Sequence, residues 1–462
     1  MKIFGWVAAL LAVVVSPIGV QPAFAVPEVT LATNPLSIDI DPGRITVSGI
    51  SSGGFMAHQL HVIHSCHIRG AGIMAGGPYD CSNNNGVYGM TACTGFMGLL
   101  PGAVGTPDIP EFKTFIDGWY DKTYTGPRDA AGVEEMASRT WASTQRIYAE
   151  EHGIDNPENL RGSRVYIFHG QKDKLLPEGV SDALFEYYKK SGVDARSIRY
   201  DKGIPAAHAV VTDNWIGWDK AQKCDTFDLA GNFINACTTR SCTDVCPKNA
   251  PSCSVALGQC KTAVSSGADV AGNILRHLYT PGANSTDDRA GPKRTNRPER
   301  EKWLKERVFS YKQVEGLDGN EDLLRRASMN DAGFLFVPKQ CRKPGAGCGL
   351  HIAFHGCKMN TNTYGTILVG GVPAFVENAG YNEWAEKNGV VVLYPVVKST
   401  NLAEADMRNP QACWDFWGYS NEPADRATYR TRDGLQTRAV WTVVERLVGK
   451  DRLDAVSSRC AK

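Results

Sequence analysis

The chain has 462 residues and 42% of them are hydrophobic, which is enough for one large domain with insertions or for two ordinary domains. Its 50 lysine and arginine residues nearly equal its 49 aspartate and glutamate residues. This balance argues against nucleic acid or an anionic membrane surface as the main partner.

The first 25 residues have the features of a secretory signal peptide. They carry one charged residue, Lys2, then the apolar run 7–15, then Ala23-Phe24-Ala25, a small-x-small pattern typical of a signal-peptidase site. A single-pass anchor is the alternative, but the apolar run is too short to span a bilayer. We therefore expect residues 1–25 to be removed, and the mature chain to lack a membrane anchor and to be secreted, extracellular or periplasmic.

All 14 cysteines follow this segment, and in an exported chain such a number predicts disulfide bonds. Five of them crowd into one polar segment, namely Cys237, Cys242, Cys246, Cys253 and Cys260. Zinc binding is the alternative, but none of the spacings is CxxC and no histidine interrupts the cluster. We expect disulfides and no metal, with a connectivity that the sequence leaves open.

Strand and helix patterns alternate along the chain. The segments predicted as strands are 45–47, 70–74, 164–168, 197–200, 334–337, 350–354 and 390–394. Helices are predicted from residue 54, near 128–152, from residue 180, around 269–279 and over 435–448. This alternation indicates a doubly wound, mostly parallel α/β sheet.

Three segments are predicted to be insertions in a single catalytic domain over 26–462, near 82–162, 237–260 and 283–330. The first holds a loop rich in glycine and proline, and the last is charged and holds no clear strand. We expect these two to lie over a sheet edge or the mouth of a site, with disorder as the alternative around 283–300.

The sequence Gly49-Ile50-Ser51-Ser52-Gly53 lies between a predicted strand and a predicted helix, which is the setting of a GxSxG nucleophile elbow. The elbow holds its serine in a strained backbone conformation, and small neighbours let the strand and the helix approach closely. A structural Gly/Ser turn is the alternative, because the pattern also occurs by chance. Ser51 is the predicted nucleophile.

A serine nucleophile needs a base to take its proton and a carboxylate to orient that base. In α/β-hydrolases the acid and then the histidine follow the serine, each on a loop after a strand. Asp173 follows the strand at 164–168, and His208 follows the strand at 197–200 in a loop of small residues. We predict that they are the acid and the base, with a solvated aspartate and a surface histidine as the alternatives.

Four other histidines lie on or just beyond the helix behind the elbow: His58, His61, His64 and His67. We expect them to point away from the serine at the start of that helix. A metal site among them would lack an acidic partner nearby in the sequence.

An oxyanion hole needs two backbone amides, usually that of the residue after the nucleophile, here Ser52, and one from a loop earlier in the chain. Only the leader and a short lead-in precede the serine, so the second amide must come from elsewhere. The strand at 350–354 leads into His355-Gly356-Cys357, a turn suited to presenting an amide. The order of the elements therefore predicts a circularly permuted α/β-hydrolase whose ends lie close together.

Eight motifs resemble those of the poly(3-hydroxybutyrate) depolymerase group, in its circularly permuted, single-domain form. In chain order they are SGISSGGFMAHQL, AGGPYDC, HGQKD, AAHAV, GFLFVPKQC, HIAFHGC, GYNEWAEKNGVVVLYP and CWDFWGY. The resemblance covers most of residues 40–450. It implies a triad of Ser51, Asp173 and His208, and an oxyanion hole made by the amides of Ser52 and Cys357.

The resemblance also implies that Trp414 and Trp417 lie beside the cleft and bind substrate, with a buried core position as the alternative for either one. Cys357 and Cys413 would both border this cleft. We expect a disulfide between these two cysteines.

We therefore expect a secreted serine esterase that hydrolyses short-chain polyhydroxyalkanoate or its oligomers through an acyl-enzyme on Ser51, without cofactor or metal. No polymer-binding module is recognised after residue 448, so amorphous polymer or soluble oligomers are the expected substrates. The alternatives are a feruloyl or acetyl esterase acting on polysaccharide, which would use the same triad, and a non-catalytic binding protein on a hydrolase scaffold.

Overall fold

The structure is a computed structural model that describes most of the chain from residue 26 onward. The described residues are 26–34, 36–94, 124–212, 222–225, 233–237, 240–242, 263–265, 268–279, 306–360, 368–369, 372–400, 409–458 and 460–461. The predicted signal peptide, and large parts of the predicted insertions, lie outside these residues.

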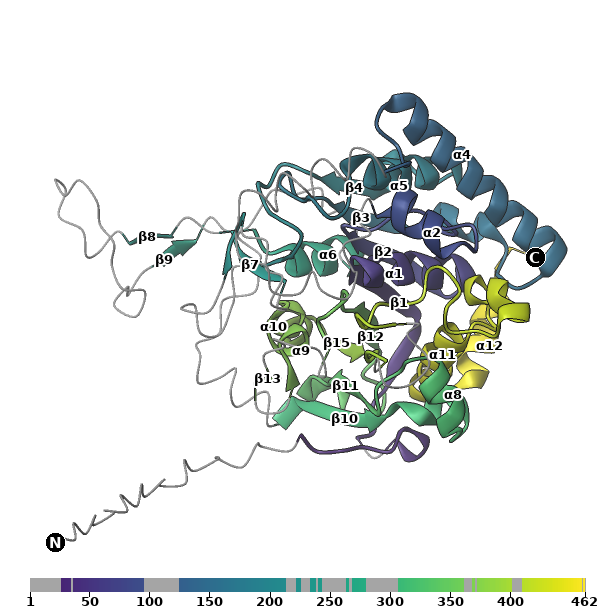
Figure 1. Cartoon of the computed structure of the whole chain (residues 1–462). Coiled ribbons are helices and arrows are strands. Elements are labelled where there is room, and N and C mark those ends of the chain that lie inside the picture. Colours follow the sequence, from purple (N-terminus) through teal and green to yellow (C-terminus); the bar gives the residue numbers. More distant parts are fainter. Residues whose placement is uncertain are drawn as a thin grey trace, which may run out of the picture.

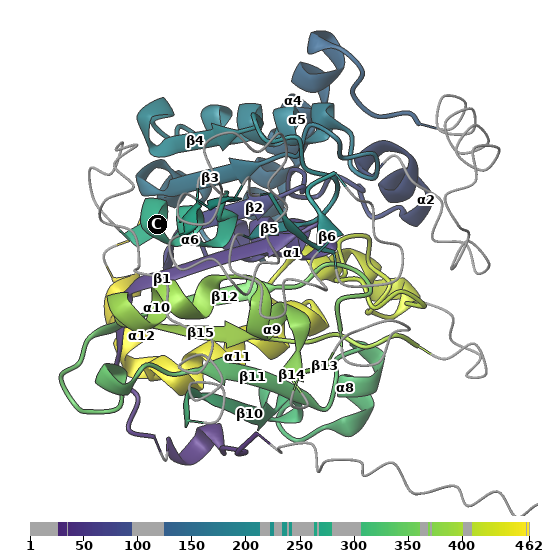
Figure 2. The same ribbon diagram turned by 90° about the vertical axis from the view of Figure 1, so that its left-hand side faces the viewer.

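An eight-stranded sheet forms the centre of the molecule (Figure 1, Figure 2). Across the sheet the strands are β10 (Val308–Lys312), β11 (Ala332–Phe336), β15 (Val390–Tyr394), β12 (Cys348–Phe354), β1 (Ile40–Ile50), β2 (Ile68–Met74), β3 (Arg164–Phe168) and β4 (Ile198–Asp201). Neighbouring strands are parallel except in the two pairs that β11 makes. The prediction of a mostly parallel α/β sheet is confirmed.

The central strands are buried on both faces. Every residue of β12 and β15 is buried, and β15 reads Val-Val-Val-Leu-Tyr without alternation. This pattern is typical of a parallel sheet covered by helices on both sides. The few polar side chains at this level pair with one another, as where His351 Nε2 lies 2.7 Å from Ser48 Oγ.

Helices cover both faces of the sheet. On one face α1 (Ser52–Ile63), α5 (Glu178–Lys190) and α11 (Leu435–Val448) share a core, and α4 (Ala130–Arg146) packs on α5 farther out. On the other face are α6 (Val270–Tyr279), α9 (Ala374–Asn378) and α10 (Tyr381–Asn388). Figure 1 shows the sheet between α6, α9 and α10 on the left and α1 and α11 on the right.

Shorter elements complete the described part of the chain. The short helices are η1 (Leu31–Thr33), α2 (Gly86–Tyr88), η2 (Gly89–Cys93), η3 (Ile147–Glu151), η4 (Pro157–Gly162), η5 (Ala195–Ser197), η9 (Gln313–Leu317), α8 (Glu321–Arg326), η10 (Lys339–Cys341), η11 (Pro423–Arg430) and α12 (Lys450–Ser457). The minor strands are β5 (Val210–Thr212), β6 (Gln222–Lys223), β7 (Ile234–Ala236), β8 (Arg240–Cys242), β9 (Ala263–Ser265), β13 (Leu368–Val369) and β14 (Val372–Pro373).

One predicted feature of the sheet is wrong. The segment 283–330 was expected to hold no clear strand, yet residues 308–312 form β10 at the edge of the sheet. An edge strand pairs on one side only, so the buried Val308, Phe309 and Tyr311 suffice to fix it beside β11. Three apolar residues within a charged segment give only a weak sequence signal for a strand.

The C-terminal end of the chain lies beside the start of β1. Arg452 Nη1 lies 2.9 Å from Asp39 Oδ1, and a disulfide joins Cys66 to Cys460. Strand β1, which ends just before Ser51, lies between β2 from the first half of the chain and β12 from the second half. This arrangement fits the expected permutation, which stays a prediction.

The prediction of disulfides is confirmed for five pairs. They join Cys66 to Cys460, Cys81 to Cys93, Cys224 to Cys237, Cys341 to Cys348, and Cys357 to Cys413. Of the crowded cysteines at 237–260, the first is thus paired, and the other four lie outside the described side chains. Within the described ranges, no helix combines the length and the apolar composition that crossing a membrane requires.

Candidate active site

Ser51 occupies a sharp turn between β1 and α1, with φ 58° and ψ −125°. Such a conformation costs a residue other than glycine about 1–3 kcal/mol. The Ser51 N–H donates to the Met74 carbonyl at 2.9 Å, which ties the turn to the neighbouring strand. A Cβ atom on Gly49 would lie 2.1 Å from the Gly53 carbonyl oxygen, so only glycine permits this approach. The strained elbow is confirmed, while the role of Ser51 as nucleophile stays a prediction.

His208 and Asp173 are paired. His208 Nδ1 lies 2.7 Å from Asp173 Oδ2, and the side chains are 5% and 1% exposed. Asp173 Oδ1 accepts the N–H groups of Leu175 and Leu176 at 2.9 Å each. Burial alone would raise the pKa of Asp173. The charge and hydrogen bond of His208, together with His169 and the Leu176 N–H, lower that pKa below its ordinary value. With Nδ1 facing the carboxylate, Nε2 is the ring nitrogen left to accept a proton.

The sheet explains why these two residues meet. Asp173 follows β3 and His208 follows β4, and the carboxyl ends of these adjacent parallel strands lie at one edge. A backbone hydrogen bond of 2.9 Å from the Lys172 N–H to the Ala206 carbonyl joins the two loops directly. The small residues before His208 therefore let one loop lie against the other.

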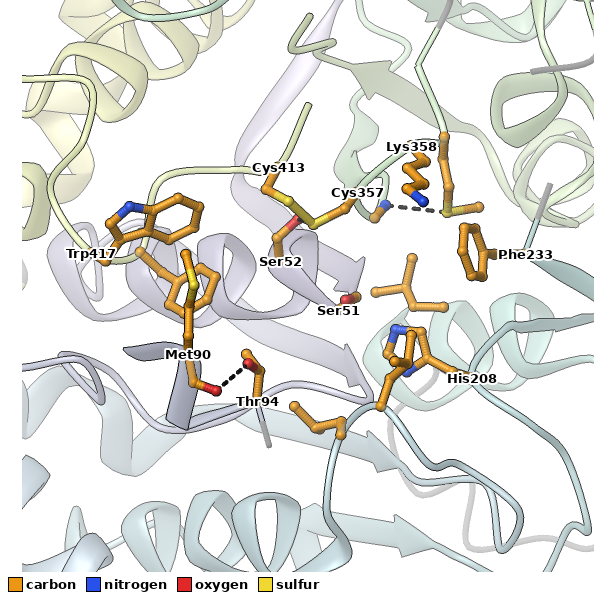
Figure 3. A pocket seen from close by; sticks show the side chains of 16 residues that line it. Ser51, Ser52, Met90, Thr94, His208, Phe233, Cys357, Lys358, Cys413 and Trp417 are labelled. Atoms are coloured by element: carbon orange, nitrogen blue, oxygen red, sulfur yellow. Dashed lines mark hydrogen bonds between the residues drawn. A yellow bond between two sulfur atoms is a disulfide. The ribbon is translucent and has the colours of Figure 1, made fainter. Parts of the chain in front are cut away.

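Ser51 and His208 line one largely apolar pocket (Figure 3). The other lining residues are Ile50, Ser52, Met90, Thr94, Leu175, Leu176, Phe233, Gly356, Cys357, Lys358, Met359, Cys413, Phe416 and Trp417. Figure 3 shows Ser51 near the centre, with Trp417, Met90 and Thr94 on one side and His208, Phe233 and Lys358 on the other. An uncharged, largely aliphatic substrate suits such a lining.

The two predicted oxyanion residues lie together at the N-terminus of α1. Ser52 is the first residue of that helix, and its Oγ lies 3.3 Å from Cys357 Sγ and accepts the Trp414 N–H at 3.2 Å. A disulfide joins Cys357 to Cys413, which confirms the predicted pairing. The bond ties the turn after β12 to the segment that carries the tryptophans. The helix N-terminus adds partial positive charge beside Ser51.

His355 fixes the orientation of the turn after β12. The Val397 N–H donates to His355 Nε2 at 3.2 Å, so the ring proton is on Nδ1, which donates to the Gly356 carbonyl at 2.7 Å. Burial lowers the pKa of His355 to about 4, which keeps the ring neutral at pH 7. The Gly356 carbonyl and the Cys357 N–H belong to one trans peptide and point in opposite directions. The hydrogen bond to the Gly356 carbonyl therefore also fixes the direction of the Cys357 N–H.

The two predicted substrate tryptophans occupy different positions. Trp417 lines the pocket, and its backbone N–H donates to Asp415 Oδ1 at 3.1 Å. Trp414 is fully buried and packs edge-on against Phe354, with ring centroids 4.7 Å apart. The expectation that Trp414 contacts substrate is therefore corrected, because its ring lies in the core behind the pocket.

Several lining residues were missed by the sequence analysis. Met90 lies in the segment closed by the Cys81–Cys93 disulfide, and Thr94 follows Cys93 directly. Phe233 comes from the segment closed by the Cys224–Cys237 disulfide. The only sequence signal for Met90 and Phe233 was that each lies between two cysteines. That signal could not be used, because the pairing of 14 cysteines is not readable from their order.

The histidines on α1 and just beyond its end make structural contacts. His61 lies 2.9 Å from both the Tyr188 hydroxyl and the Ser163 hydroxyl. His64 stacks on Trp441 with ring centroids 3.7 Å apart. Tyr188 and Trp441 belong to the hydrophobic core, and neither histidine is among the residues that line the pocket.

One group of metal-binding residue types does come together, at Cys66, His67 and Asp155. Asp155, from a segment distant in the sequence, thus supplies the acidic residue that is missing near these histidines. However, the Cys66 sulfur is in the disulfide with Cys460, and the Asp155 carboxylate accepts the Cys66 N–H and pairs with Arg432. The group therefore has no thiolate or uncommitted carboxylate to offer an ion.

Proteins with similar sequences are named as polyester depolymerases. A poly(3-hydroxybutyrate) depolymerase of Delftia acidovorans is 31% identical over 419 residues, which cover 90% of this chain and 62% of that protein. A polyhydroxybutyrate depolymerase of Talaromyces funiculosus is 26% identical over 420 residues, 89% of this chain and 91% of that protein. This chain therefore spans less than two thirds of the length of the Delftia protein. No protein-family model matches the chain.

Two solved structures share the fold. One is a PHB depolymerase from Penicillium funiculosum, with a TM-score of 0.55 and 22% identity, and the match covers 92% of this chain and 98% of that one. The other is a PHB depolymerase complexed with an R3HB trimer, with the same TM-score and 21% identity. Over 90% of its sequence and in its α/β fold, this chain is thus similar to the poly(3-hydroxybutyrate) depolymerases.

Proposed function

We propose that this protein is a serine esterase that hydrolyses poly(3-hydroxybutyrate), other short-chain polyhydroxyalkanoates, or their oligomers. The observation that carries the proposal is that His208, paired with Asp173 at 2.7 Å, lines the same pocket as a serine held in a strained elbow. The similar proteins and structures named above support the substrate class.

In the proposed reaction His208 takes the hydroxyl proton of Ser51, and the serine oxygen attacks the ester carbonyl carbon. The amides of Ser52 and Cys357 stabilise the negative oxygen that forms. His208 then gives the proton to the departing alkoxide, which leaves as an alcohol. Water hydrolyses the acyl-enzyme by the same steps and regenerates Ser51. Asp173, kept ionised by its lowered pKa, stabilises the imidazolium in both halves of the reaction.

The pocket supports an aliphatic polyester as substrate. Each repeat of the polymer carries a methyl group and an ester but no other polar group, so most of its binding energy must come from apolar burial. Leu176, Phe233 and Trp417 supply apolar surface around Ser51. Amorphous polymer and soluble oligomers, whose segments can enter a pocket singly, are the proposed forms of the substrate.

Export from the cytoplasm is part of the proposal. The five disulfides support it, because disulfides form and persist in oxidising compartments. The leader-like residues 1–25 support it as well.

The test is release of hydroxybutyrate from an amorphous polymer suspension by the purified protein. Ser51→Ala should abolish release, while Ser138→Ala, at an exposed serine on α4, should leave it unchanged. An organophosphate should label Ser51 stoichiometrically. Labelling of another serine, or faster release of ferulate or acetate from polysaccharide than of hydroxybutyrate from polymer, would reject the proposal.

A further inference from the structure

Lys358 brings a positive charge to an otherwise apolar pocket. It is one of the lining residues and is 6% exposed. Among the described lining residues it is the only lysine or arginine, and no aspartate or glutamate lines the pocket with it. Because an ammonium forms strong, charge-assisted hydrogen bonds with carboxylates, the side chain is a candidate for substrate recognition.

The backbone holds Lys358 in a strained conformation. Its φ is 64°, a left-handed conformation in which glycine or asparagine would be less strained. Its N–H donates to the Gln411 carbonyl at 2.8 Å, and the Met359 N–H donates to the Gly356 carbonyl at 3.3 Å. This short turn follows Cys357 directly, so the lysine is fixed relative to the proposed oxyanion hole.

Lys358 lies on the side of the pocket where the alcohol must leave. His208 gives its proton to the departing oxygen, so the leaving unit lies on the His208 side of Ser51. Figure 3 shows Lys358 and Phe233 on this side, and the rings of Phe233 and His208 lie 6.2 Å apart in an edge-on contact. Trp417 and Met90 lie on the opposite side, which is left for the acyl chain.

A 3-hydroxyacyl oligomer has a defined direction. The departing alcohol belongs to the unit nearer the carboxyl end, and its own carboxyl carbon is two bonds beyond the carbon that bears the oxygen. When that unit is the last one, the carboxyl group is a free carboxylate. An ammonium beside the leaving unit then meets a negative charge, and a charge-assisted hydrogen bond can form.

From this geometry, and resting on the proposed function, we infer that Lys358 binds the free carboxylate of the terminal 3-hydroxyacyl unit. The enzyme would then prefer the last ester bond of an oligomer and release one 3-hydroxy acid per cleavage from the carboxyl end. Burial lowers the pKa of Lys358, and a bound carboxylate would favour its charged form.

The first experiment needs no variant. The purified enzyme is given the (R)-3-hydroxybutyrate trimer as the free acid, as its methyl ester, and as the free acid with its terminal hydroxyl acetylated. The free acid should have a kcat/KM about tenfold or more above that of the methyl ester, the usual range for a hydrogen bond to a charged group. The acetylated acid should behave like the free acid. With isotope in the carboxyl-terminal unit, the first monomer released should carry the label.

Equal kcat/KM values for acid and methyl ester would overturn the inference and leave the proposed function standing. Hydrolysis of neither compound would overturn both. A first monomer released from the hydroxyl end would also overturn the inference, because the lysine would then lie beside the wrong end of the chain.

The second experiment compares the two substrates within each variant, so that a general loss of activity cancels. Lys358→Met should bring the ratio of kcat/KM for acid over methyl ester close to one, while Lys358→Arg should keep most of the preference. A preference that persists in Lys358→Met, or equal losses on both substrates with the ratio unchanged, would overturn the inference. If turnover in Lys358→Met is too slow to measure, the inhibition constants of 3-hydroxybutyrate and of its methyl ester can be compared instead.

Discussion

The imidazole of His355 donates from Nδ1 to the carbonyl oxygen of Gly356, 2.7 Å away, and so sets the peptide plane that presents the Cys357 amide. The two residues are adjacent in the sequence, yet the tautomer that makes the bond is fixed by Val397, from the loop after β15. The neutral His355 therefore links the loop after β15 to the Cys357 amide in the turn after β12.

His355→Leu should lower kcat about tenfold to a hundredfold with little change in KM. The reason is that the Cys357 amide belongs to the proposed oxyanion hole, whose donors act in the transition state. Losing one such donor outright costs about 100- to 1000-fold. His351→Gln is the matched control, because His351 is equally buried on β12 but contacts Ser48 and Thr46 in the core. It should lower the melting temperature and leave the kcat of the folded enzyme unchanged. A raised KM with unchanged kcat in His355→Leu would contradict this positioning role.

Asp173 and His208 should act as a unit with Ser51. Asp173→Asn and His208→Ala should each lower kcat by several orders of magnitude, and the double variant should lose little more than either single one. Steady-state kinetics on a soluble nitrophenyl ester measures this. Losses that multiply in the double variant would count against the triad.

Replacing Trp417 should impair polymer hydrolysis, whereas replacing Trp414 should lower stability. Trp417→Ala removes apolar surface from the pocket, so it should weaken hydrolysis of polymer more than hydrolysis of a small nitrophenyl ester. Trp414→Ala removes a fully buried ring and should cost about 3–5 kcal/mol of folding free energy. Kinetics on both substrates, together with urea unfolding, separates the effects. Equal kinetic losses on both substrates in Trp417→Ala would refute its role in binding the polymer.

Removing the Cys357–Cys413 disulfide should affect catalysis as well as stability. It closes a sequence separation of 56 residues, so replacing both cysteines by alanine should cost about 4 kcal/mol. The Cys341–Cys348 disulfide, which closes a separation of 7 and does not line the pocket, is the control and should cost about 2 kcal/mol. Only the first double variant should lose kcat at temperatures where both are folded. An unchanged kcat there would show that the turn keeps its position without the bond.

Stability should fall as the pH falls below about 6.5. Burial lowers the pKa of His58, His61 and His351 to about 3, while each histidine regains its ordinary pKa when the chain unfolds. Between these values the unfolded chain binds more protons than the folded one, so each such histidine should cost about 2 kcal/mol of stability at pH 5. The lowered pKa of Asp173 acts in the same direction at lower pH, because its stabilisation is lost as the carboxylate becomes protonated.

Urea unfolding at several pH values between 7.5 and 5 tests this dependence. His61→Gln should reduce its slope, and the exposed His152, replaced by glutamine, should not. A free energy of unfolding that does not change over this range would contradict the prediction.

The sequence alone determined the features that depend on neighbours a few residues apart. The elbow around Ser51 was readable because glycine, serine and the flanking strand and helix patterns are all local. The strands at 164–168 and 390–394 and the helix at 435–448 agree with the structure because their apolar runs are long and regular. The order of Asp173 and His208 after their strands was also readable, because parallel strands end at the same edge of a sheet.

Only the tertiary structure decided which side chains face the pocket. Trp414 and Trp417 look alike in the sequence, but one ring packs in the core against Phe354 while the other lines the pocket. Met90 and Phe233 enter the pocket from loops held by disulfides, and β10 is fixed by pairing with β11. These outcomes depend on contacts between segments far apart in the chain. Local periodicity and propensity carry no information about such contacts, since they report only what each residue's near neighbours favour.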